Sequence, residues 1–272
     1  GGTFAEASIG PIKTLNPLYA TTESERTAVR LLFSGLLSYD KTGHLSYDLA
    51  NNITLGRDGK TYTLVIDDDA SWSDGKKLTS SDVLFTLDLI RNPSVRAGQS
   101  LRNSWEGIKA KAIDETTVEF KLPASYAAFP HALTFSILPK HILGNVEASQ
   151  IRENIFSVSP VGSGPYQVKL SRNSVVAQNE KKILYLSKND NYYGQKPKVS
   201  RFEIHSYSDA NGLINALESR DVNAAVIPSS EVATNVPSLY TKKLLPTNNG
   251  VFVTLNTTSS ILRSKVVRQA LQ

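Results

Sequence analysis

The sequence feature that most constrains the fold is a strand–helix–strand pattern in the second half of the chain. Residues 202–204 and 224–227 have the apolar character of short strands, and residues 209–219 between them carry leucine and alanine at helical spacing. Strand, helix and strand within roughly thirty residues form a βαβ unit, in which the crossover helix makes the two strands run parallel. A parallel pair of strands is therefore expected in this half.

The first half of the chain follows a different pattern. Apolar and polar side chains alternate over residues 61–66 and 117–122, which predicts strands of a mixed or antiparallel sheet with one face open to water. A helix is predicted over residues 79–91, where Thr79 and Asp82 form a capping box, and another over residues 25–37. Residues 92–103 are predicted to be a loop. The other predicted elements are strands at residues 1–9, 166–170, 183–186 and 251–255 and a helix over residues 266–271.

Composition narrows the class of protein. A chain of 272 residues forms one large domain or two modest ones, and its apolar stretches are far shorter than a bilayer span. The 30 basic and 25 acidic residues give a net charge of +5, but the lysines occur in scattered pairs rather than in the patch that a nucleic-acid binder presents. The absence of cysteine excludes disulfides, zinc–thiolate sites, iron–sulfur clusters and a cysteine nucleophile.

The sequence shows no reaction centre. The four histidines do not have the spacing of the paired ligands of a zinc protease. Gly162, Ser163 and Gly164 resemble the turn that carries a serine nucleophile, but Pro165 would block the helix that has to follow it. The acidic run at residues 67–69 departs from the spacing of a calcium loop. We therefore expect no catalytic residue, no metal site and no cofactor, and elimination favours binding over catalysis.

Eight motifs occur in a fixed order between residues 14 and 271. They are TLNP (14–17), LFSGLL (32–37), DLA followed by DGKTYT (48–63), WSDG followed by LTSSDV (72–83), ILPKH (137–141), PVGSGPY (160–166), NYYGQKP (191–197) and SKVVRQAL (264–271). Together they resemble the motifs of the extracytoplasmic solute-binding proteins of family 5, the oligopeptide-, dipeptide- and nickel-binding group that serves ABC importers. Asn16 and Tyr193 depart from the family's aspartate and tryptophan, which indicates a divergent member.

The resemblance gives a structural role to the residues that carry two of these motifs. They are Trp72, Ser73, Asp74, Gly75, Thr79, Asp82, Gly162, Gly164, Pro165 and Tyr166.

The resemblance implies a mixed α/β fold, namely the first lobe of a type II periplasmic-binding-protein-like structure with an inserted α+β subdomain. Residues 1–44 and 156–272 would form the discontinuous core of this lobe, and residues 45–155 the insert. The second lobe would be missing after residue 272. The chain is then expected to be a truncated fragment that folds but binds ligand far more weakly than the intact protein.

The function implied by the resemblance is capture of a solute, foremost an oligopeptide, in an interlobe cleft that closes by hinge motion, before docking on the permease of an ABC importer. Main-chain hydrogen bonds would hold a peptide. The expected ligand-binding residues are Ser8, Ile9, Gly10, Pro11 and Ile12, in the loop after the first strand, with a plain connecting loop as the alternative. Trp105, like Trp72, is a candidate for stacking on a ligand, with interior packing as the alternative.

Three other interpretations stay open at this point. The solute could be a nickel chelate, haem or a sugar; the chain could be an enzyme on the same scaffold; or its charge of +5 could serve an anionic surface. The resemblance favours a binding protein without enzyme activity, cofactor or nucleic-acid partner. It also implies a location outside the cytoplasmic membrane, either free in a periplasm or tethered to the cell surface by a lipid.

Overall fold

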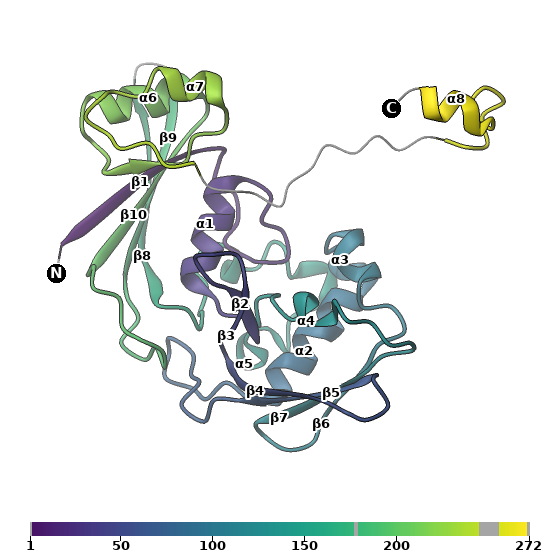
Figure 1. Cartoon of the computed structure of the whole chain (residues 1–272). Coiled ribbons are helices and arrows are strands. Elements are labelled where there is room, and N and C mark those ends of the chain that lie inside the picture. Colours follow the sequence, from purple (N-terminus) through teal and green to yellow (C-terminus); the bar gives the residue numbers. More distant parts are fainter. Residues whose placement is uncertain (1, 177–178, 245–255, 271–272) are drawn as a thin grey trace. The chain divides into compact units, whose positions relative to one another are not determined.

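The computed structural model describes residues 2–176, 179–244 and 256–270. The chain divides into two compact units, Gly1–Pro237 and Ser238–Gln272, which are described separately. Figure 1 gives the labels of the helices and strands.

The elements have the following bounds. The strands are β1 (Thr3–Ile9), β2 (Leu37–Tyr39), β3 (Leu45–Tyr47), β4 (Ala50–Leu55), β5 (Thr61–Ile66), β6 (Lys109–Ala112), β7 (Thr117–Lys121), β8 (Tyr166–Val176), β9 (Asn179–Lys188), β10 (Arg201–Tyr207) and β11 (Ala224–Ala225). The helices are α1 (Glu23–Leu32), α2 (Ser80–Arg91), α3 (Gln99–Asn103), α4 (Phe129–Ala132), α5 (Lys140–Leu143), α6 (Ala210–Glu218), α7 (Ser230–Thr234) and α8 (Lys265–Ala270). Short 3₁₀ turns lie at Pro93–Val95, Ala148–Gln150 and Ile155–Ser157.

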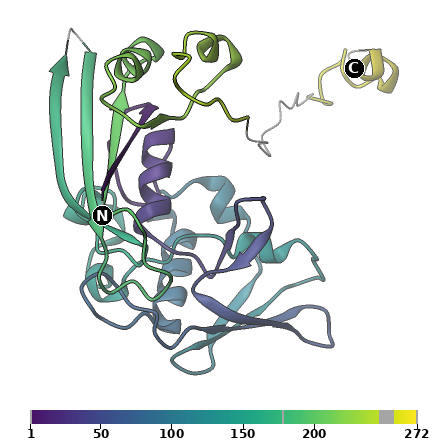
Figure 2. The same cartoon turned by 60° about the vertical axis from the view of Figure 1, so that its left-hand side comes forward.

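One sheet of the first unit has the strand order β11-β1-β10-β9-β8 (Figures 1 and 2). Strand β1 runs parallel to both β10 and β11, and β9 runs antiparallel to β10 and β8. The predicted βαβ unit is thus present as β10-α6-β11, with its two strands parallel. A local pattern suggests that these two strands are neighbours in the sheet. They are not, because β1 from the other end of the chain lies between them.

The two faces of this sheet carry different helices. Ser8 of β1 meets Ser24 of α1, with 2.5 Å between their Oγ atoms. Ala5 and Ala7 alternate with Ser8 and are buried on the opposite face, where α6 packs against β1. Small side chains on that face allow the helix to approach closely. Helices α1 and α6 therefore cover opposite faces of the sheet.

Helix α1 ends earlier than predicted. Helical spacing predicted a helix as far as residue 37, but α1 stops at Leu32 and the following backbone is extended. There Ser34 accepts a hydrogen bond from the Ile137 N–H at 3.1 Å, and Gly35 forms a bridge with Ser136. The apolar residues at the end of the predicted helix are buried, but this pairing with a distant segment holds them in an extended conformation.

The second sheet has the order β4-β5-β7-β6 and is antiparallel throughout. Its predicted alternation is confirmed, because Tyr62, Leu64, Ile66, Val118 and Phe120 are all buried. Helix α2 packs against this sheet and begins as predicted, since the Asp82 carboxylate accepts a hydrogen bond from the Thr79 N–H at 2.9 Å.

Several predicted boundaries change. The predicted loop at residues 92–103 contains the 3₁₀ turn Pro93–Val95 and helix α3, and β8 and β9 extend well beyond the predicted strands. Helix α8 matches the predicted helix near the end of the chain, whereas the predicted strand at residues 251–255 lies outside the described residues. No helix in the described part of the chain is both long enough and apolar enough to cross a membrane.

The first unit contains the predicted insert and most of the predicted core. The five-stranded sheet falls within residues 1–44 and 156–237, and the four-stranded sheet within residues 45–155. The boundary predicted between residues 44 and 45 lies inside the hairpin of β2 and β3, which pair antiparallel. The core of the first lobe, predicted to continue to residue 272, meets a unit boundary after Pro237. The division into core and insert stays a prediction, and residues 45–155 are called the insert below.

Candidate functional site

The carboxyl ends of β1 and β10 form a topological switch point. The two strands are adjacent and parallel, but the chain leaves β1 toward α1 on one face and leaves β10 toward α6 on the other. In open α/β sheets, ligands bind outside the carboxyl ends of the strands at such a point. The predicted ligand-binding residues 8–12 lie there, at the end of β1.

The structure gives these five residues different environments. Ser8 is fully buried and Ile12 is 4% exposed, so both side chains support the fold. Ile9 and Gly10 are half-buried and Pro11 is exposed. Gly10 has a φ of 107°, which favours glycine, and its N–H donates to the Tyr207 carbonyl at 2.9 Å. Among the described residues the Gly10 carbonyl accepts no hydrogen bond.

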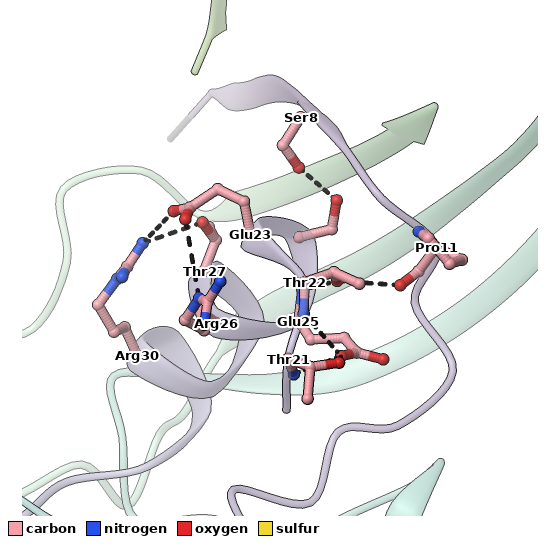
Figure 3. A network of polar contacts seen from close by, with 10 residues as sticks. Ser8, Pro11, Thr21, Thr22, Glu23, Glu25, Arg26, Thr27 and Arg30 are labelled. Atoms are coloured by element: carbon pink, nitrogen blue, oxygen red, sulfur yellow. Dashed lines mark hydrogen bonds and ion pairs between the residues drawn. The ribbon is translucent and has the colours of Figure 1, made fainter. Parts of the chain in front are cut away.

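A buried carboxylate fixes the loop between β1 and α1. Glu25, in the first turn of α1, is 2% exposed. Its Oε1 accepts from the N–H groups of Lys13 at 2.9 Å and Thr14 at 3.1 Å, and its Oε2 from those of Thr21 at 2.8 Å and Thr22 at 3.1 Å. Figure 3 shows Glu25 beside Thr21 and Thr22. One side chain therefore joins both ends of the loop.

The charge of Glu25 is favoured in the folded protein. Burial by itself raises the pKa of a carboxyl group, but the four backbone N–H donors outweigh it and lower the pKa of Glu25. Lys182 of β9 reaches the same loop, because its Nζ donates to the Ile12 carbonyl at 2.7 Å. Thr22 Oγ1 donates to the Pro11 carbonyl at 3.0 Å (Figure 3). The spacing of Thr22 and Glu25 is that of a capping box, which is a sequence signal for the contact between them. The sequence offered no signal for the contacts from Lys13, Thr14 and Lys182.

Tyr207 closes the other side of the switch point. It ends β10, and a Cβ on Gly212 of α6 would lie 2.9 Å from its ring, so the ring packs closely against that helix. Burial, with the negative charge of Asp221, raises the pKa of Tyr207 to about 12. The hydroxyl therefore stays protonated at neutral pH and can donate a hydrogen bond.

A segment of the insert reaches the loop after β1. The Tyr19 hydroxyl donates to the Val95 carbonyl at 2.7 Å, and the Arg152 guanidinium lies 4.1 Å from the centre of the Tyr19 ring. The insert therefore helps to hold the loop that follows β1.

The signature residues lie elsewhere and meet one another. The Ser73 N–H donates to the Gly162 carbonyl at 2.7 Å, which joins the WSDG turn to the PVGSGPY segment. Trp72 is fully buried, and Gly75 has a φ of 85° at the turn. Asp74 lies 2.7 Å from His141 Nε2. These contacts fit the structural role that the resemblance gives to the WSDG turn.

The glycines of the second motif allow close packing on α1. A Cβ on Gly162 would lie 1.9 Å from the Leu32 carbonyl oxygen, and one on Gly164 would lie 2.6 Å from the Leu31 oxygen. The Pro165 carbonyl accepts from the Asn189 N–H at 2.9 Å, and the Tyr166 hydroxyl donates to the Val199 carbonyl at 3.0 Å. The PVGSGPY motif therefore seals the junction between the five-stranded sheet, α1 and the insert.

Trp105 is part of the interior of the insert. It is 1% exposed, and its ring packs against Phe120, Phe129 and Phe135 at centroid distances of 5.8, 5.8 and 5.1 Å. Stacking on a ligand requires an exposed ring face, so this placement favours the interior-packing alternative for the ring. No group of three or more potential metal ligands occurs among the residues that the structure describes.

Comparisons with known proteins agree with this architecture. Residues 44–272 match the family described as bacterial extracellular solute-binding proteins, family 5 Middle. The oligopeptide-binding protein AppA of Bacillus subtilis is 29% identical over 279 residues, which cover 100% of this chain and 49% of that protein. The chain thus spans about half the length of this curated relative.

Two solved structures share the fold. The structure of AppA from Bacillus subtilis in complex with a nonapeptide matches with a TM-score of 0.73 at 28% identity, covering 86% of this chain and 45% of that one. The structure of NikZ from Campylobacter jejuni in complex with Ni(L-His) matches with a TM-score of 0.70 at 29% identity, covering 83% and 43%. The mixed α/β, periplasmic-binding-protein-like fold predicted from the sequence is confirmed by these matches.

Proposed function

The chain belongs to family 5 of the bacterial extracellular solute-binding proteins, and on that premise we propose that it captures an oligopeptide for an ABC importer. The family consists of binding proteins, in agreement with the prediction that the chain is not an enzyme. The proposal includes a location outside the cytoplasmic membrane, in a periplasm or on a lipid tether, and docking on the permease of the importer.

The observation that carries the peptide proposal is the fixed main chain at the end of β1. Glu25 and Lys182 immobilise the loop, so the unpaired Gly10 carbonyl is held in place before a ligand arrives. A carbonyl at the end of a strand suits an extended peptide, whose N–H groups continue the pattern of a sheet. Preorganisation lowers the entropy cost of binding. AppA, which matches the whole of this chain over 49% of its own length, is described as an oligopeptide-binding protein.

A non-peptide solute is the second candidate. The match to NikZ in complex with Ni(L-His) is nearly as good as that to AppA, with a TM-score of 0.70 against 0.73. The fold therefore accommodates both classes of ligand, and the unpaired Gly10 carbonyl supports the peptide as the first candidate.

Calorimetry with the protein purified from its host tests this proposal. Peptides of one length with different side chains should bind with dissociation constants within about tenfold of one another, because main-chain contacts dominate. N-methylation of a contacted main-chain amide should weaken binding by about tenfold, the effect of losing roughly 1.4 kcal/mol. Glu25→Gln should weaken binding more than Glu23→Gln, since the ion pairs that Glu23 forms among the described residues, with Arg26 and Arg30, lie at the surface.

Two results would contradict it. Binding of Ni²⁺ with free histidine in the absence of any peptide binding would favour the second candidate. Peptide affinities that follow the side chains and ignore N-methylation would show that main-chain recognition at this loop is wrong.

A further inference from the structure

Two consecutive lysines of β9 have different roles beside the carboxyl ends of β1 and β10. Lys182 lies on the face of the sheet that α1 covers, where its Nζ donates to the Ile12 carbonyl at 2.7 Å. Side chains alternate along a strand, so Lys181 lies on the opposite face. Among the described residues, the Lys181 ammonium has no hydrogen bond and no ion pair. This part of the protein therefore leaves one cation of the candidate site without an anionic partner.

The position of Lys181 is set by the pairing of the strands. Ile9 of β1 is aligned with Tyr207 of β10, and Tyr207 with Lys181 of β9. Residues directly opposite each other on adjacent strands share one face of the sheet, so these three form a row across its end. Gly10 comes next in the chain, and its N–H donates to the Tyr207 carbonyl at 2.9 Å. Because adjacent strands lie about 4.8 Å apart, Lys181 is roughly 10 Å from the end of β1.

The Tyr207 ring holds the ammonium in this row. Lys181 Nζ lies 5.5 Å from the centre of the ring, which is within the range of a cation–π contact. The lysine is half-buried, so it stays accessible to a ligand while the partly apolar surroundings strengthen its attraction for an anion. Lys181 is therefore both held in place and able to bind.

The charged groups around this row do not compete for Lys181. Glu203 lies 2.9 Å from His205 Nε2, and the Asp209 carboxylate accepts a hydrogen bond from the first turn of α6 at 2.9 Å. Burial, together with the positive charge of Lys181, lowers the pKa of His205, so the imidazole is uncharged at neutral pH. Asp221 forms no ion pair with Lys181 within the described residues. A ligand carboxylate would thus meet an unpaired ammonium.

We propose that Lys181 determines the charge preference of the candidate site by binding a carboxylate of the captured peptide. This inference rests on the proposed function and adds the chemical class of the peptide. A lysine ammonium donates hydrogen bonds and carries a charge, so it binds a carboxylate more strongly than an uncharged amide oxygen.

The spacing in the sheet indicates where that carboxylate lies in the peptide. An extended chain advances about 3.4 Å per residue, so roughly 10 Å corresponds to about three residues from the main-chain N–H that binds the Gly10 carbonyl. Either the carboxyl terminus or an acidic side chain can supply the group. The two sources share this chemistry, and the experiment has to separate them.

Isothermal titration calorimetry with two pairs of alanine–serine hexapeptides tests the proposal. In the first pair the carboxyl terminus is either free or amidated. In the second pair the terminus is amidated in both members, and one glutamate, moved through the internal positions, is compared with glutamine. We expect the wild-type protein at low ionic strength to bind the acidic member of at least one pair about tenfold more tightly than the neutral member.

Matched variants complete the test. Lys181→Gln should reduce this preference to less than about twofold without weakening the binding of neutral peptides, and Lys181→Arg should retain the preference. Lys188→Gln is the control, because Lys188 lies at the other end of the same strand, and this variant should keep the wild-type preference.

Each outcome has a distinct meaning. A Lys181-dependent preference confined to the first pair would assign the carboxyl terminus of the peptide, and one confined to the second pair an acidic side chain. Equal affinities within both pairs, or a preference that survives Lys181→Gln, would overturn the proposal and leave peptide capture intact. Equal weakening of acidic and neutral peptides by Lys181→Gln would give the lysine a structural role and also overturn it. If none of the peptides binds the wild-type protein, peptide capture itself fails, and this inference fails with it.

Discussion

At the residue scale, Glu25 does most to shape the candidate site. Four backbone N–H groups from both ends of a loop converge on one carboxylate that water hardly reaches. Hydrogen bonds to a charged group are worth more than those between neutral groups, about 1.5–3 kcal/mol. The ordered loop after β1 therefore depends on one ionised side chain, and its stability depends on pH.

Glu25→Gln should lower the free energy of unfolding by about 2–3 kcal/mol at pH 7, because an amide presents an N–H₂ group to some of these donors. The pKa of Glu25 is lower in the folded state than in the unfolded state. The charge therefore stabilises the fold above the unfolded pKa, about 4.3, and this contribution disappears as the pH falls through the folded pKa. Urea denaturation at pH 7 and at about pH 3 should show the difference between wild type and variant shrinking in acid.

Glu23→Gln is the matched control for this measurement. Glu23 is in the same helical turn, but its ion pairs with Arg26 and Arg30 are exposed, and such pairs contribute less than about 1 kcal/mol. Equal losses for the two variants, or a loss at Glu25 that does not change with pH, would contradict the assigned role.

At the scale of elements, the glycines of the PVGSGPY motif explain how α1 meets the strand that begins at Tyr166. The motif passes so close to the end of α1 that the Gly164 N–H donates to the Leu32 carbonyl at 2.9 Å. The same turn accepts a hydrogen bond from Ser73 of the insert. The absence of a side chain at residue 162 thus allows three elements to meet at one point.

Gly162→Ala should destabilise the chain by about 3 kcal/mol or more, because its Cβ would lie 1.9 Å from the Leu32 oxygen and the backbone has to move. Gly98→Ala is the control, since a Cβ there meets nothing within 4 Å, and its effect should stay within about 1 kcal/mol. Thermal or urea unfolding measures both. A loss at Gly162 no greater than at Gly98 would mean that the close approach does not restrict the fold.

Local patterns in the sequence predicted those elements whose partners lie nearby in the chain. Alternation found β5 and β7, and the Thr79–Asp82 box found the start of α2. The features that the sequence did not predict depend on pairing between segments far apart in the chain. The end of α1 depends on segment 136–137, and the place of β1 between β10 and β11 depends on residues about 200 positions away.

In the candidate site, too, a local pattern in the sequence predicted some features, while others depend on contacts between distant segments. The resemblance located the loop at residues 8–12, because its motif follows directly in the sequence. The roles of Glu25 and Lys182 depend on three-dimensional contacts, since Lys182 lies 170 positions from the carbonyl it binds. Trp105 illustrates the reverse case, in which a tryptophan beside a predicted loop is enclosed by aromatic rings from other elements.

At the scale of the whole molecule, the two sheets of the first unit share one hydrophobic core. A continuous cluster of buried side chains includes Leu184 and Ile204 from the five-stranded sheet and Leu64 and Phe120 from the four-stranded sheet. Trp72 belongs to the same cluster. The predicted core and insert are therefore separate stretches of the sequence, but their buried side chains form one continuous cluster.

This continuity predicts that Gly1–Pro237 unfolds in a single cooperative transition, because opening the insert alone would expose buried side chains of the five-stranded sheet to water. Hydrogen exchange is the measurement, since it follows each sheet separately. The most protected amides of β5 and β7 should exchange with the same free energy as those of β9 and β10, within about 0.5 kcal/mol. Gly162→Ala should lower both values together. If β5 and β7 exchange at a clearly lower free energy, and Gly162→Ala moves only one of the two sheets, the insert is an independent domain and the shared core is not what holds the unit together.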